Sequence, residues 1–555
     1  MRRLTASTLT LMFFFFCGFA GGQNPPPDLV LFNGKIFTSN DAQPYVEALA
    51  IRGERIIATG DSTKIKSLAG PQTKRIDLAG RTVIPGINDA HNHLELQPVN
   101  EVDVHLKTMN PKWDEVRDAI GATAGKSPNK SLIVVTIGSA IFQDISVNRD
   151  SLDKVAPEIP VLLVTFTGHG FILNSSGLTF FGVADNQADP AGGRFERDAK
   201  GRLTGVVREY AGFDIDRTVE NGVPEKDAVT QLRSTLDDAE RFGITSIQDM
   251  SNGIPPARAV ALLEEVPTRI RIRVIRMPGT TAAGRDVEEG KGVPRNPNGL
   301  ITVSGTKWMT DGVPIEGTST AREAIKMPAA PPFDEIFGDL PLTFPEKEIA
   351  AMLKESLKDN DQLMLHVSGY RAAKAVLDAM DATGGKNVWA GRRVRFEHGD
   401  SLFPDLVARV KEYGIVVVQN PSHLMGLSSV ASSGTAAFSK AQPLRSLLAA
   451  GIPVALGSDG PTNPFLNIMF ATIHGDRPSE AITREQAVVA YTLTAAYSEF
   501  AEKEKGSLEP GKLADLAVLS QDIFRVSPLD LPKTESILTM VGGKVVYDSK
   551  LLTIQ

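Results

Sequence analysis

The sequence predicts an α/β fold built around a TIM-type (β/α)8 barrel. The middle of the chain alternates short apolar runs with helix-like segments, a pattern typical of parallel sheets. Eight of the apolar runs can serve as barrel strands, and polar residues end most of them. Polar groups are expected at the carboxyl ends of barrel strands, where active sites form. Periodicity alone leaves a doubly wound sheet open as an alternative.

The composition is that of an ordinary globular protein, with 42% hydrophobic and 23% charged residues. A chain of 555 residues predicts one large domain with an appendage, or two to three domains. The formal net charge is −7, and it becomes −9 if Arg2 and Arg3 are removed. This mild acidity argues against nucleic acid as the main partner and favours a small-molecule substrate. The sequence does not specify an oligomeric state.

Residues 1–22 are predicted to be a signal peptide. Arg2 and Arg3 form a short basic start, residues 9–19 are almost wholly apolar, and small residues follow. We expect cleavage before Gln23 and export to the periplasm or the medium. The apolar run is shorter than the ~20 residues of a transmembrane helix, so no stable membrane anchor is expected.

Residues 23–84 and 501–555 are predicted to be rich in β-strands. Gly and Asn-Gly turns separate the runs LVLFNGKIFT, EALAIRG and RIIATG in the first segment. The runs LADLAVLS and MVGGKVVYD have the same character near the C-terminus. The barrel is therefore expected between them, at residues 85–500.

The eight expected barrel strands lie within short segments that helix-like stretches mostly separate. They are TVIPGINDAHNHLE (82–95), ITSIQDM (244–250), RIRVIRM (271–277), VSGTKWMTDG (303–312), LMLHVSG (363–369), VRFEHGD (394–400), IVVVQNPSH (415–423) and PVALGSD (453–459). A clear helix-like stretch runs from Glu346 to Lys358. Two further strand candidates, at 132–138 and 161–169, are assigned to an insertion at about residues 96–230, after the first barrel strand.

His91 and His93 form the most specific feature of the chain. Residues i and i+2 of a strand point to the same side, so both imidazoles can reach one metal ion. Two histidines in a polar loop would be the alternative. The only cysteine, Cys17, lies in the predicted signal peptide, so the mature chain offers no thiolate. Imidazole and carboxylate ligands suit Zn²⁺. Polar residues that end other predicted strands would meet this pair at the barrel mouth: Lys307, His366, His398 and Asp459.

These motifs resemble the metal-dependent amidohydrolase superfamily, in particular amidohydrolase family 3 with its YtcJ-like and N-substituted formamide deformylase-like members. The resemblance extends from about Asp28 to about Tyr547. It rests on PGINDAHNHLE, TGVVRE, GITSIQDM, KWMTDG, LHVSG, RFEHGD, ALGSDGP and GSLEPGKLADLAVLS. The resemblance implies that both ends of the chain join in one small β-sandwich beside the barrel.

The resemblance also implies a role for each strand-end residue. His91 and His93 would bind the more buried metal, and His366 and His398 would bind a second one. Lys307 would be carbamylated to bridge two metals, because a free ammonium group cannot be a ligand. Asp459 would contact metal and act as the general base. Whether one or two metals bind is left open.

Each of these residues also has a purely structural interpretation. Lys307 could be a buried ion-pair lysine, and His366 and His398 could be simple strand-end histidines. Asp459 could be a helix N-cap before the Gly-Pro that follows it. Glu397 precedes His398, and strand alternation predicts that it points away from His398 and anchors the barrel wall.

Four further residues are predicted to contact substrate. His169 ends an apolar strand, and Glu209 could position a substrate amine or form a structural salt bridge with a basic residue. His423 ends the seventh barrel strand and could face the pocket. Tyr370 stands in HVSGYRA where the family commonly has Asp in HAIGDRA, so substrate recognition or the tuning of His366 is expected to differ from the family pattern.

Three functions are compatible with these features. The first is hydrolysis of an amide-like, non-peptide C–N bond by metal-activated water, with Asp459 as the general base. The second keeps the metal site but cleaves an ester, a lactone or a cyclic ureide. The third is a non-catalytic barrel retained for binding or regulation.

Overall fold

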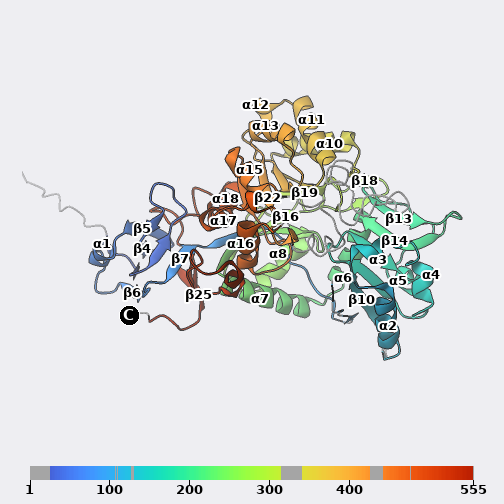
Figure 1. The fold of residues 1–555 in the computed structure, drawn as a ribbon, viewed down its shortest axis with the longest axis horizontal. Helices are drawn as coiled ribbons and strands as arrows, with labels where there is room; N and C mark the ends of the chain where they lie inside the picture. Colours follow the sequence, from blue (N-terminus) through green and yellow to red (C-terminus); the bar gives the residue numbers. More distant parts are fainter. Residues whose placement is uncertain are drawn as a thin grey trace, which may run out of the picture.

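The computed structural model describes residues 25–99, 101–104, 106, 108, 111–126, 131–313, 340–424, 442–475 and 477–553. The predicted signal peptide and its cleavage site lie outside these residues. A barrel occupies the centre of the molecule, with a β-sandwich on one side and an insertion on the other (Figure 1). No helix within the described ranges is long and apolar enough to cross a membrane.

The central barrel contains eight parallel strands in the order β23-β22-β21-β20-β19-β16-β15-β8. They are β8 (Ile87–Asn92), β15 (Ile244–Ser251), β16 (Arg271–Arg276), β19 (Ile301–Met309), β20 (Leu363–Val367), β21 (Arg395–His398), β22 (Val416–Gln419) and β23 (Val454–Leu456). Backbone N–H groups just after β23 then reach back to β8: Asp459 donates to the His91 carbonyl at 2.9 Å, and Ser458 donates to the Asp89 side chain at 2.8 Å. These bonds join the two ends of the sheet. The predicted TIM-type barrel is therefore confirmed, and the doubly wound sheet is wrong.

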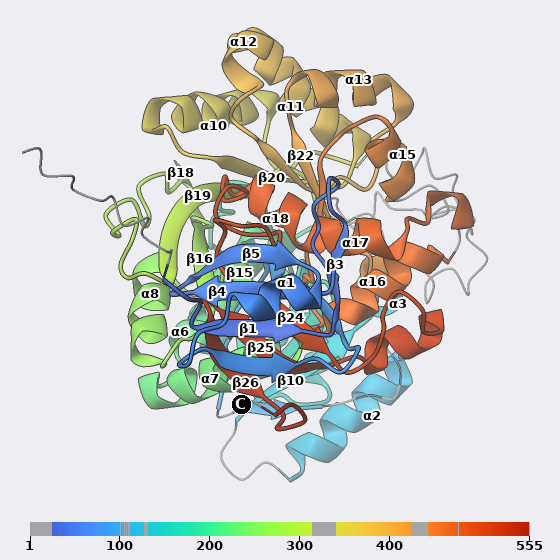
Figure 2. The same ribbon diagram turned by 90° about the vertical axis from the view of Figure 1, so that its left-hand side faces the viewer.

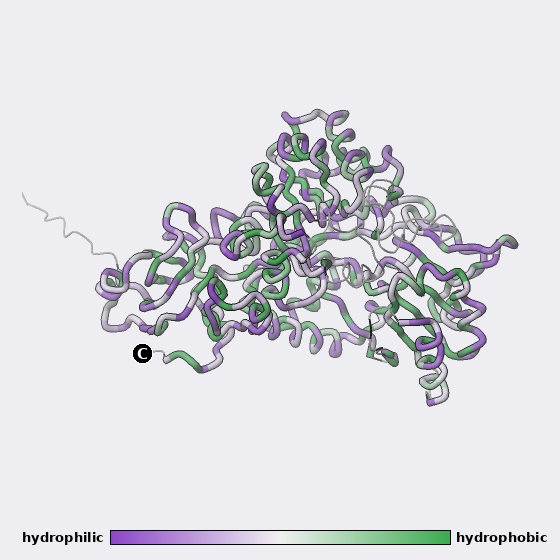
Figure 3. Tube along the Cα trace, in the orientation of Figure 1, coloured by the Kyte–Doolittle hydropathy of each residue, from purple (hydrophilic) through white to green (hydrophobic). Residues whose placement is uncertain are grey.

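Helices pack around this barrel. They are α7 (Glu225–Arg241), α8 (Pro256–Glu265), α10 (Glu346–Asp359), α11 (Tyr370–Ala382), α12 (Lys386–Trp389), α13 (Pro404–Glu412), α15 (Leu444–Ala449), α16 (Pro464–Ile473), the 3-10 helix η3 (Pro478–Glu480), α17 (Arg484–Tyr491) and α18 (Leu493–Ser498). The helix predicted from Glu346 is α10, whose buried residues Ile349, Met352, Leu353 and Ser356 recur at helical spacing. Hydrophilic and hydrophobic residues alternate along the outer helices (Figure 3), a pattern typical of helices with one side against a core.

The chain between β16 and β19 forms a hairpin of β17 (Thr280–Thr281) and β18 (Gly284–Arg285).

The β-sandwich joins both ends of the chain, as the family resemblance predicts. One sheet has the order β5-β4-β1-β6, and the other has the order β26-β25-β24-β7-β2-β3. Strand β24 pairs antiparallel with β7 across more than 400 residues of sequence, with Leu516 opposite Pro85. The elements are β1 (Leu29–Phe32), β2 (Lys35–Phe37), β3 (Tyr45–Val46), β4 (Ala48–Arg52), β5 (Arg55–Gly60), α1 (Ser62–Ser67), β6 (Lys74–Asp77), β7 (Thr82–Pro85), β24 (Leu516–Leu519), the 3-10 helix η4 (Pro528–Lys533), β25 (Ser536–Val541) and β26 (Lys544–Asp548).

Buried apolar residues from both sheets, such as Leu31, Ile51, Val83 and Leu516, form one core between them. Figure 2 views the molecule from this end, with the blue N-terminal strands beside the red C-terminal ones. The exact domain boundaries, at residues 84/85 and 500/501, stay predictions.

The insertion after β8 is a six-stranded sheet in the order β13-β14-β12-β11-β10-β9. It contains β9 (Glu101–Asp103), α2 (Trp113–Ala124), β10 (Leu132–Ile137), α3 (Ser139–Gln143), α4 (Arg149–Asp153), β11 (Val161–Thr165), β12 (Gly170–Leu173), α5 (Ser175–Phe180), β13 (Gly193–Arg197), β14 (Leu203–Glu209) and α6 (Tyr210–Asn221). The two strand candidates assigned to an insertion are β10 and β11, which lie outside the barrel sheet.

Candidate metal-dependent active site

The carboxyl ends of the barrel strands bring the predicted metal ligands together. His91 in β8 lies beside His93, with 5.3 Å between the ring centroids, and beside His398 of β21, with 5.0 Å. The ring of His366 in β20 is 4.4 Å from that of His398. Four histidines from three separate segments of the sequence therefore form one continuous cluster at the end of the barrel where active sites of this fold lie.

Asp459 follows β23 and lies within this cluster. Its Oδ1 is 3.5 Å from His91 Nε2 and 3.3 Å from His93 Nε2, and its Oδ2 is 3.7 Å from His398 Nδ1. Although burial alone would raise the pKa of this carboxyl, the imidazoles around it hold the pKa well below its usual value. The Asp459 side chain is therefore ionised at neutral pH, the form in which a carboxylate can bind a metal or accept a proton.

Asp459 is not a helix cap. Helix α16 begins at Pro464, and its N-cap is Asn463, whose side chain accepts a hydrogen bond from the Phe465 N–H. Asp459 itself has a φ of 42°, a conformation that costs residues other than glycine about 1–3 kcal/mol. The structural interpretation of Asp459 as an N-cap is wrong, and its strained backbone holds the carboxylate among the histidines.

Glu397 orients His91. Its Oε2 lies 2.6 Å from His91 Nδ1, and Arg395 Nε donates to its other oxygen at 2.7 Å; both side chains of this Arg–Glu pair are fully buried. Burial opposes ionisation of Glu397, but Arg395 and His91 hold its pKa well below the usual range. The carboxylate thus accepts the proton on Nδ1 and places the lone pair of His91 on Nε2, where Lys307 Nζ lies at 3.0 Å.

Glu397 was predicted to point away from His398 and to anchor the barrel wall. Its buried pair with Arg395 fits an anchoring role, and its contact with His91 was not predicted. Strand alternation assumes extended backbone, whereas His398 has a φ of 73° at the end of β21. The turn at His398 lets Glu397 and His398, which are successive residues, both contact the ring of His91.

The other imidazoles are also oriented by neighbours. Asn252 Oδ1 is 2.8 Å from Nδ1 of His93, and Asn420 Oδ1 is 2.9 Å from Nδ1 of His398. Burial lowers the pKa of His91 to about 4 and those of His366 and His398 well below their usual value. Neutral imidazoles are the form that binds metal.

One ring nitrogen of His366 is suited to a metal. Its Nδ1 is buried and has no hydrogen-bond partner among the described residues. Its Nε2 lies 3.3 Å from Ser368 Oγ and 3.7 Å from Asp311 Oδ1. An unpartnered buried nitrogen is unfavourable unless another group occupies its lone pair. A divalent metal fits this nitrogen and the surrounding imidazole and carboxylate donors.

Lys307 faces the barrel interior. Its Nζ lies 3.0 Å from His91 Nε2, and its charge interacts with the carboxylates of Asp459 and Glu397. The interpretations as a buried ion-pair lysine and as a metal-site residue both stay predictions. Burial lowers its pKa, which increases the fraction of free amine.

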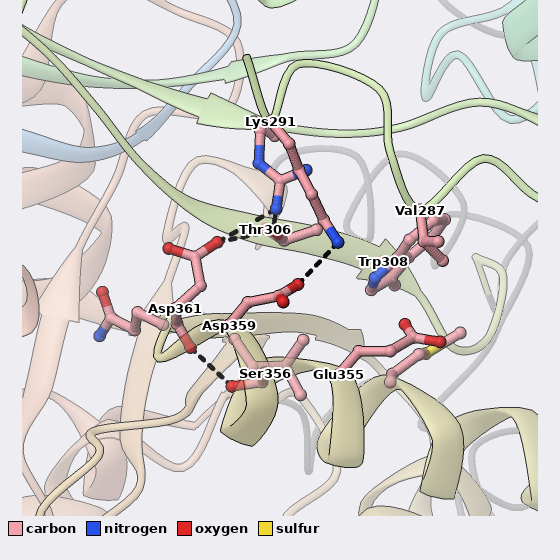
Figure 4. Close-up of a pocket in the computed structure, with 12 residues that line it drawn as sticks. Val287, Lys291, Thr306, Trp308, Glu355, Ser356, Asp359 and Asp361 are labelled. Carbon is pink, nitrogen blue, oxygen red and sulfur yellow. Dashed lines mark hydrogen bonds and ion pairs between the residues drawn. The ribbon is translucent and has the colours of Figure 1, made fainter. Parts of the chain in front are cut away.

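The residues on either side of Lys307 point outward, as strand alternation requires. Thr306 and Trp308 line a small cavity of about 20 Å³ between β19 and α10 (Figure 4). The polar groups there bind one another: Lys291 Nζ is 2.8 Å from Asp359 Oδ2, and Thr306 donates to Asp361 at 2.8 Å. None of the histidines lines this cavity. It is a gap in the packing between β19 and α10 and is separate from the candidate site.

Among the residues that the structure describes, two groups of donor atoms converge closely enough for a common ion. They are His91, His93 and Asp459, and His398, His423 and Asp459; the donor atoms of each group lie within 4.8 Å of one another. The first group was predicted. His423 was predicted to contact substrate, but the structure places its Nε2 3.4 Å from Asp459 Oδ2 and stacks its ring 5.6 Å from that of His398.

The insertion contributes His169 and Glu209. His169 Nδ1 lies 2.8 Å from Glu209 Oε2, and the His169 ring is 5.3 Å from that of His366. The predicted alternative of a salt bridge between Glu209 and a basic residue stays a prediction. Sequence reasoning treated the two residues separately, and nothing in the sequence indicates that β12 and β14 are neighbours.

Tyr370 is placed differently from the other candidates. Its hydroxyl donates to Asp405 Oδ2 at 2.8 Å, and its ring packs on Phe403 at 5.5 Å. Phe403 immediately precedes α13, and Asp405 lies in its first turn. A contact between Tyr370 and substrate stays a prediction.

Asp311 was missed by sequence reasoning. It is fully buried, and it accepts the backbone N–H of Ser368 at 3.1 Å and of Gly369 at 2.6 Å. Burial raises its pKa well above the usual value. The polar end of the strand in KWMTDG was the available signal. Asp311 shapes the turn after His366.

Comparisons with known proteins agree with this geometry. A model of the Amidohydrolase family matches residues 74–547. Protein LONG AFTER FAR-RED 3 of Arabidopsis thaliana is 28% identical over 556 residues, covering 94% of this chain and 91% of its own. N-substituted formamide deformylase of Arthrobacter pascens is 26% identical over 547 residues, covering 94% and 98%.

Solved structures share the fold. An uncharacterized metal-dependent hydrolase from Pyrococcus horikoshii OT3 matches with a TM-score of 0.63 at 21% identity, covering 90% of this chain and 99% of that chain. At this level of identity, the likeness concerns the fold alone.

Proposed function

Because the chain belongs to the amidohydrolase family, we propose that it cleaves a non-peptide C–N bond of the amide or formamide kind, with Asp459 as the general base. The observation that carries the proposal is the position of Asp459, whose carboxylate lies within 3.7 Å of nitrogens from His91, His93 and His398. A proton acceptor in contact with metal ligands is what hydrolysis by an activated water requires.

The proposed metal is Zn²⁺, as one or two ions. His91 and His93 would hold the first, and His366 and His398 the second, while a carbamylated Lys307 would bridge them and Asp459 would contact metal. When bound, such a metal lowers the pKa of a water towards ~7 and polarises a carbonyl. His423, at 3.4 Å from Asp459, supports a site with room for a second ion.

The chain's own groups then move the proton. Asp459 accepts a proton from water as the water oxygen bonds to the carbonyl carbon. The C–N bond breaks, and Asp459 delivers the proton to the leaving nitrogen, so that the products are a carboxylic acid and an amine. His169, Glu209, His423 and Tyr370 are proposed to contact the substrate.

A hydrolase screen tests this proposal. Purified, zinc-loaded protein is assayed on N-substituted formamides, other amides, aryl esters, lactones, cyclic ureides and phosphotriesters. We expect the highest kcat/KM on a formamide or amide. A preference for esters, lactones or ureides would contradict the proposed bond while leaving a metal-dependent hydrolase. Formamides are placed first because a relative of similar length is named for that substrate.

Metal removal tests whether the hydrolysis depends on a bound metal. Chelation should lower the rate by at least about 10²-fold, because the metal contributes several kcal/mol to the lowering of the barrier. Zinc should then restore the rate. Elemental analysis should find one or two metal ions per chain. A content far below one per chain after supplementation, with no activity, would favour a non-catalytic binding protein.

We further propose that the protein is exported. The basic start, the apolar residues 9–19 and the small residues before Gln23 support this proposal. Expressed in a Gram-negative host, the full chain should appear in the periplasm or the medium with an N-terminus near Gln23, as read by mass spectrometry. A chain that lacks residues 1–22 is the control and should stay in the cytoplasm. An uncleaved full chain in the cytoplasm would contradict export.

A further inference from the structure

Two neighbouring strands of the insertion hold His169 and Glu209 as a rigid pair. Strands β12 and β14 pair antiparallel, with Gly170 opposite Arg208. Just beyond that pair, the Glu209 N–H donates to the His169 carbonyl at 3.0 Å, and the two side chains meet at 2.8 Å. Both residues are buried, with 9% and 2% of their surfaces exposed. The pair is therefore fixed by backbone and side-chain bonds together.

The backbone at Glu209 is strained. Its φ of 50° and ψ of −130° are unfavourable for a residue with a side chain, and such conformations cluster at functional sites. The next residue, Tyr210, begins α6, and its hydroxyl accepts the Met309 N–H at 3.1 Å. That bond ties the strained turn to β19, the barrel strand that contains Lys307. The insertion is thus anchored to the barrel at the point where the pair enters the site.

The hydrogen bond to Glu209 decides which nitrogen of His169 is available. A carboxylate only accepts hydrogen bonds, so the imidazole proton lies on Nδ1 and the lone pair lies on Nε2. No described residue hydrogen-bonds to Nε2, and 11% of the His169 side chain is exposed. The ring packs on Phe213 at 5.6 Å and on His366 at 5.3 Å. Nε2 is thus an open acceptor beside a proposed metal ligand.

We propose that Nε2 of His169 accepts a hydrogen bond from the N–H of the scissile amide. The substrate class would then be primary and secondary amides, with tertiary amides and esters disfavoured because they have no N–H to donate. This inference rests on the proposed function of the site. A role as a metal ligand is the alternative for this imidazole nitrogen, and the metal content of the His169 variant distinguishes the two roles.

The test compares an N-aryl formamide with its N-methyl counterpart and with the aryl formate, using the zinc-loaded full chain. In His169→Phe, kcat/KM for the secondary formamide should fall about tenfold or more, while that for the tertiary formamide stays within about twofold. The ratio of kcat/KM for the secondary formamide to kcat/KM for the tertiary formamide should therefore fall by about tenfold or more. The comparison between variants removes differences in intrinsic reactivity between the substrates.

Two further variants sharpen the result. Glu209→Gln can donate to Nδ1 and move the proton of His169 to Nε2, so it should also lose the preference for the N–H substrate. His474→Phe removes another buried histidine, one that binds the Gln442 carbonyl at 2.8 Å, and it should leave the preference unchanged. Metal content is measured for every variant and should equal that of the wild type.

The failures can be told apart. If the wild type hydrolyses amides but His169→Phe keeps the same preference, the inference is wrong and the proposed function stands. Loss of one metal ion per chain in His169→Phe would make His169 a ligand and would also overturn the inference. If no amide is hydrolysed by the wild type, the proposed function fails, and the inference fails with it.

Discussion

Replacing Asp459 with asparagine is expected to lower kcat by about 10³- to 10⁴-fold while metal stays bound, because general acid–base catalysis contributes up to about that factor. Asparagine has the shape of aspartate but cannot accept a proton from water. It also tolerates positive φ, so the conformation at 42° does not oppose the change. The measurements are kcat on the best substrate of the screen and metal content by elemental analysis.

A matched control is Asp515→Asn. Asp515 is a buried aspartate that binds Arg271 at 2.9 Å in the sandwich region, away from the histidines. It should cost stability without changing kcat. If Asp459→Asn retained wild-type kcat with full metal, Asp459 would not be the base.

The second large effect is expected for Glu397→Gln. The carboxylate accepts from His91 Nδ1 at 2.6 Å and is paired with Arg395, so the variant leaves a buried guanidinium without its counter-charge. Loss of a partner that orients a ligand typically weakens metal binding about 10- to 100-fold. Removing one member of a buried ion pair costs about 3–5 kcal/mol in the free energy of unfolding. Metal titration and chemical denaturation of the metal-free protein measure the two effects separately.

Glu240→Gln is the control for this prediction. Glu240 is 1% exposed and binds Arg269, with Nε at 2.9 Å, in a region without the histidines. Both variants should destabilise the metal-free protein, but only Glu397→Gln should weaken metal binding. Equal metal affinity in Glu397→Gln and the wild type would show that Glu397 is a structural residue only.

Much of the barrel could be predicted because its strands are buried on both sides. Such strands have continuous apolar sequences, as in β22 and β23, and a polar residue then marks the end of each. The histidine pair at the end of β8 could also be predicted, because strand alternation puts His91 and His93 on one side. These features depend only on the spacing of residues along one strand, so the sequence is enough to predict them.

Other features depend on contacts between distant segments. Strand alternation did not indicate the contact between Glu397 and His91, because that contact joins two strands that are distant in the sequence. The pairing of β24 with β7, and of β12 with β14, brings together segments whose sequences do not indicate a partner. The sandwich was expected only through the family resemblance.

By itself, the sequence determined the eight strands, the residues that end them and, through the motifs, the family and its metal-dependent chemistry. Only the tertiary structure decided which of these residues meet. It placed Asp459 among three histidines, made Glu397 a partner of His91, and joined His169 to Glu209. The physical reason is that periodicity reports which side of an element is buried, whereas the contact between two side chains depends on how separate elements pack.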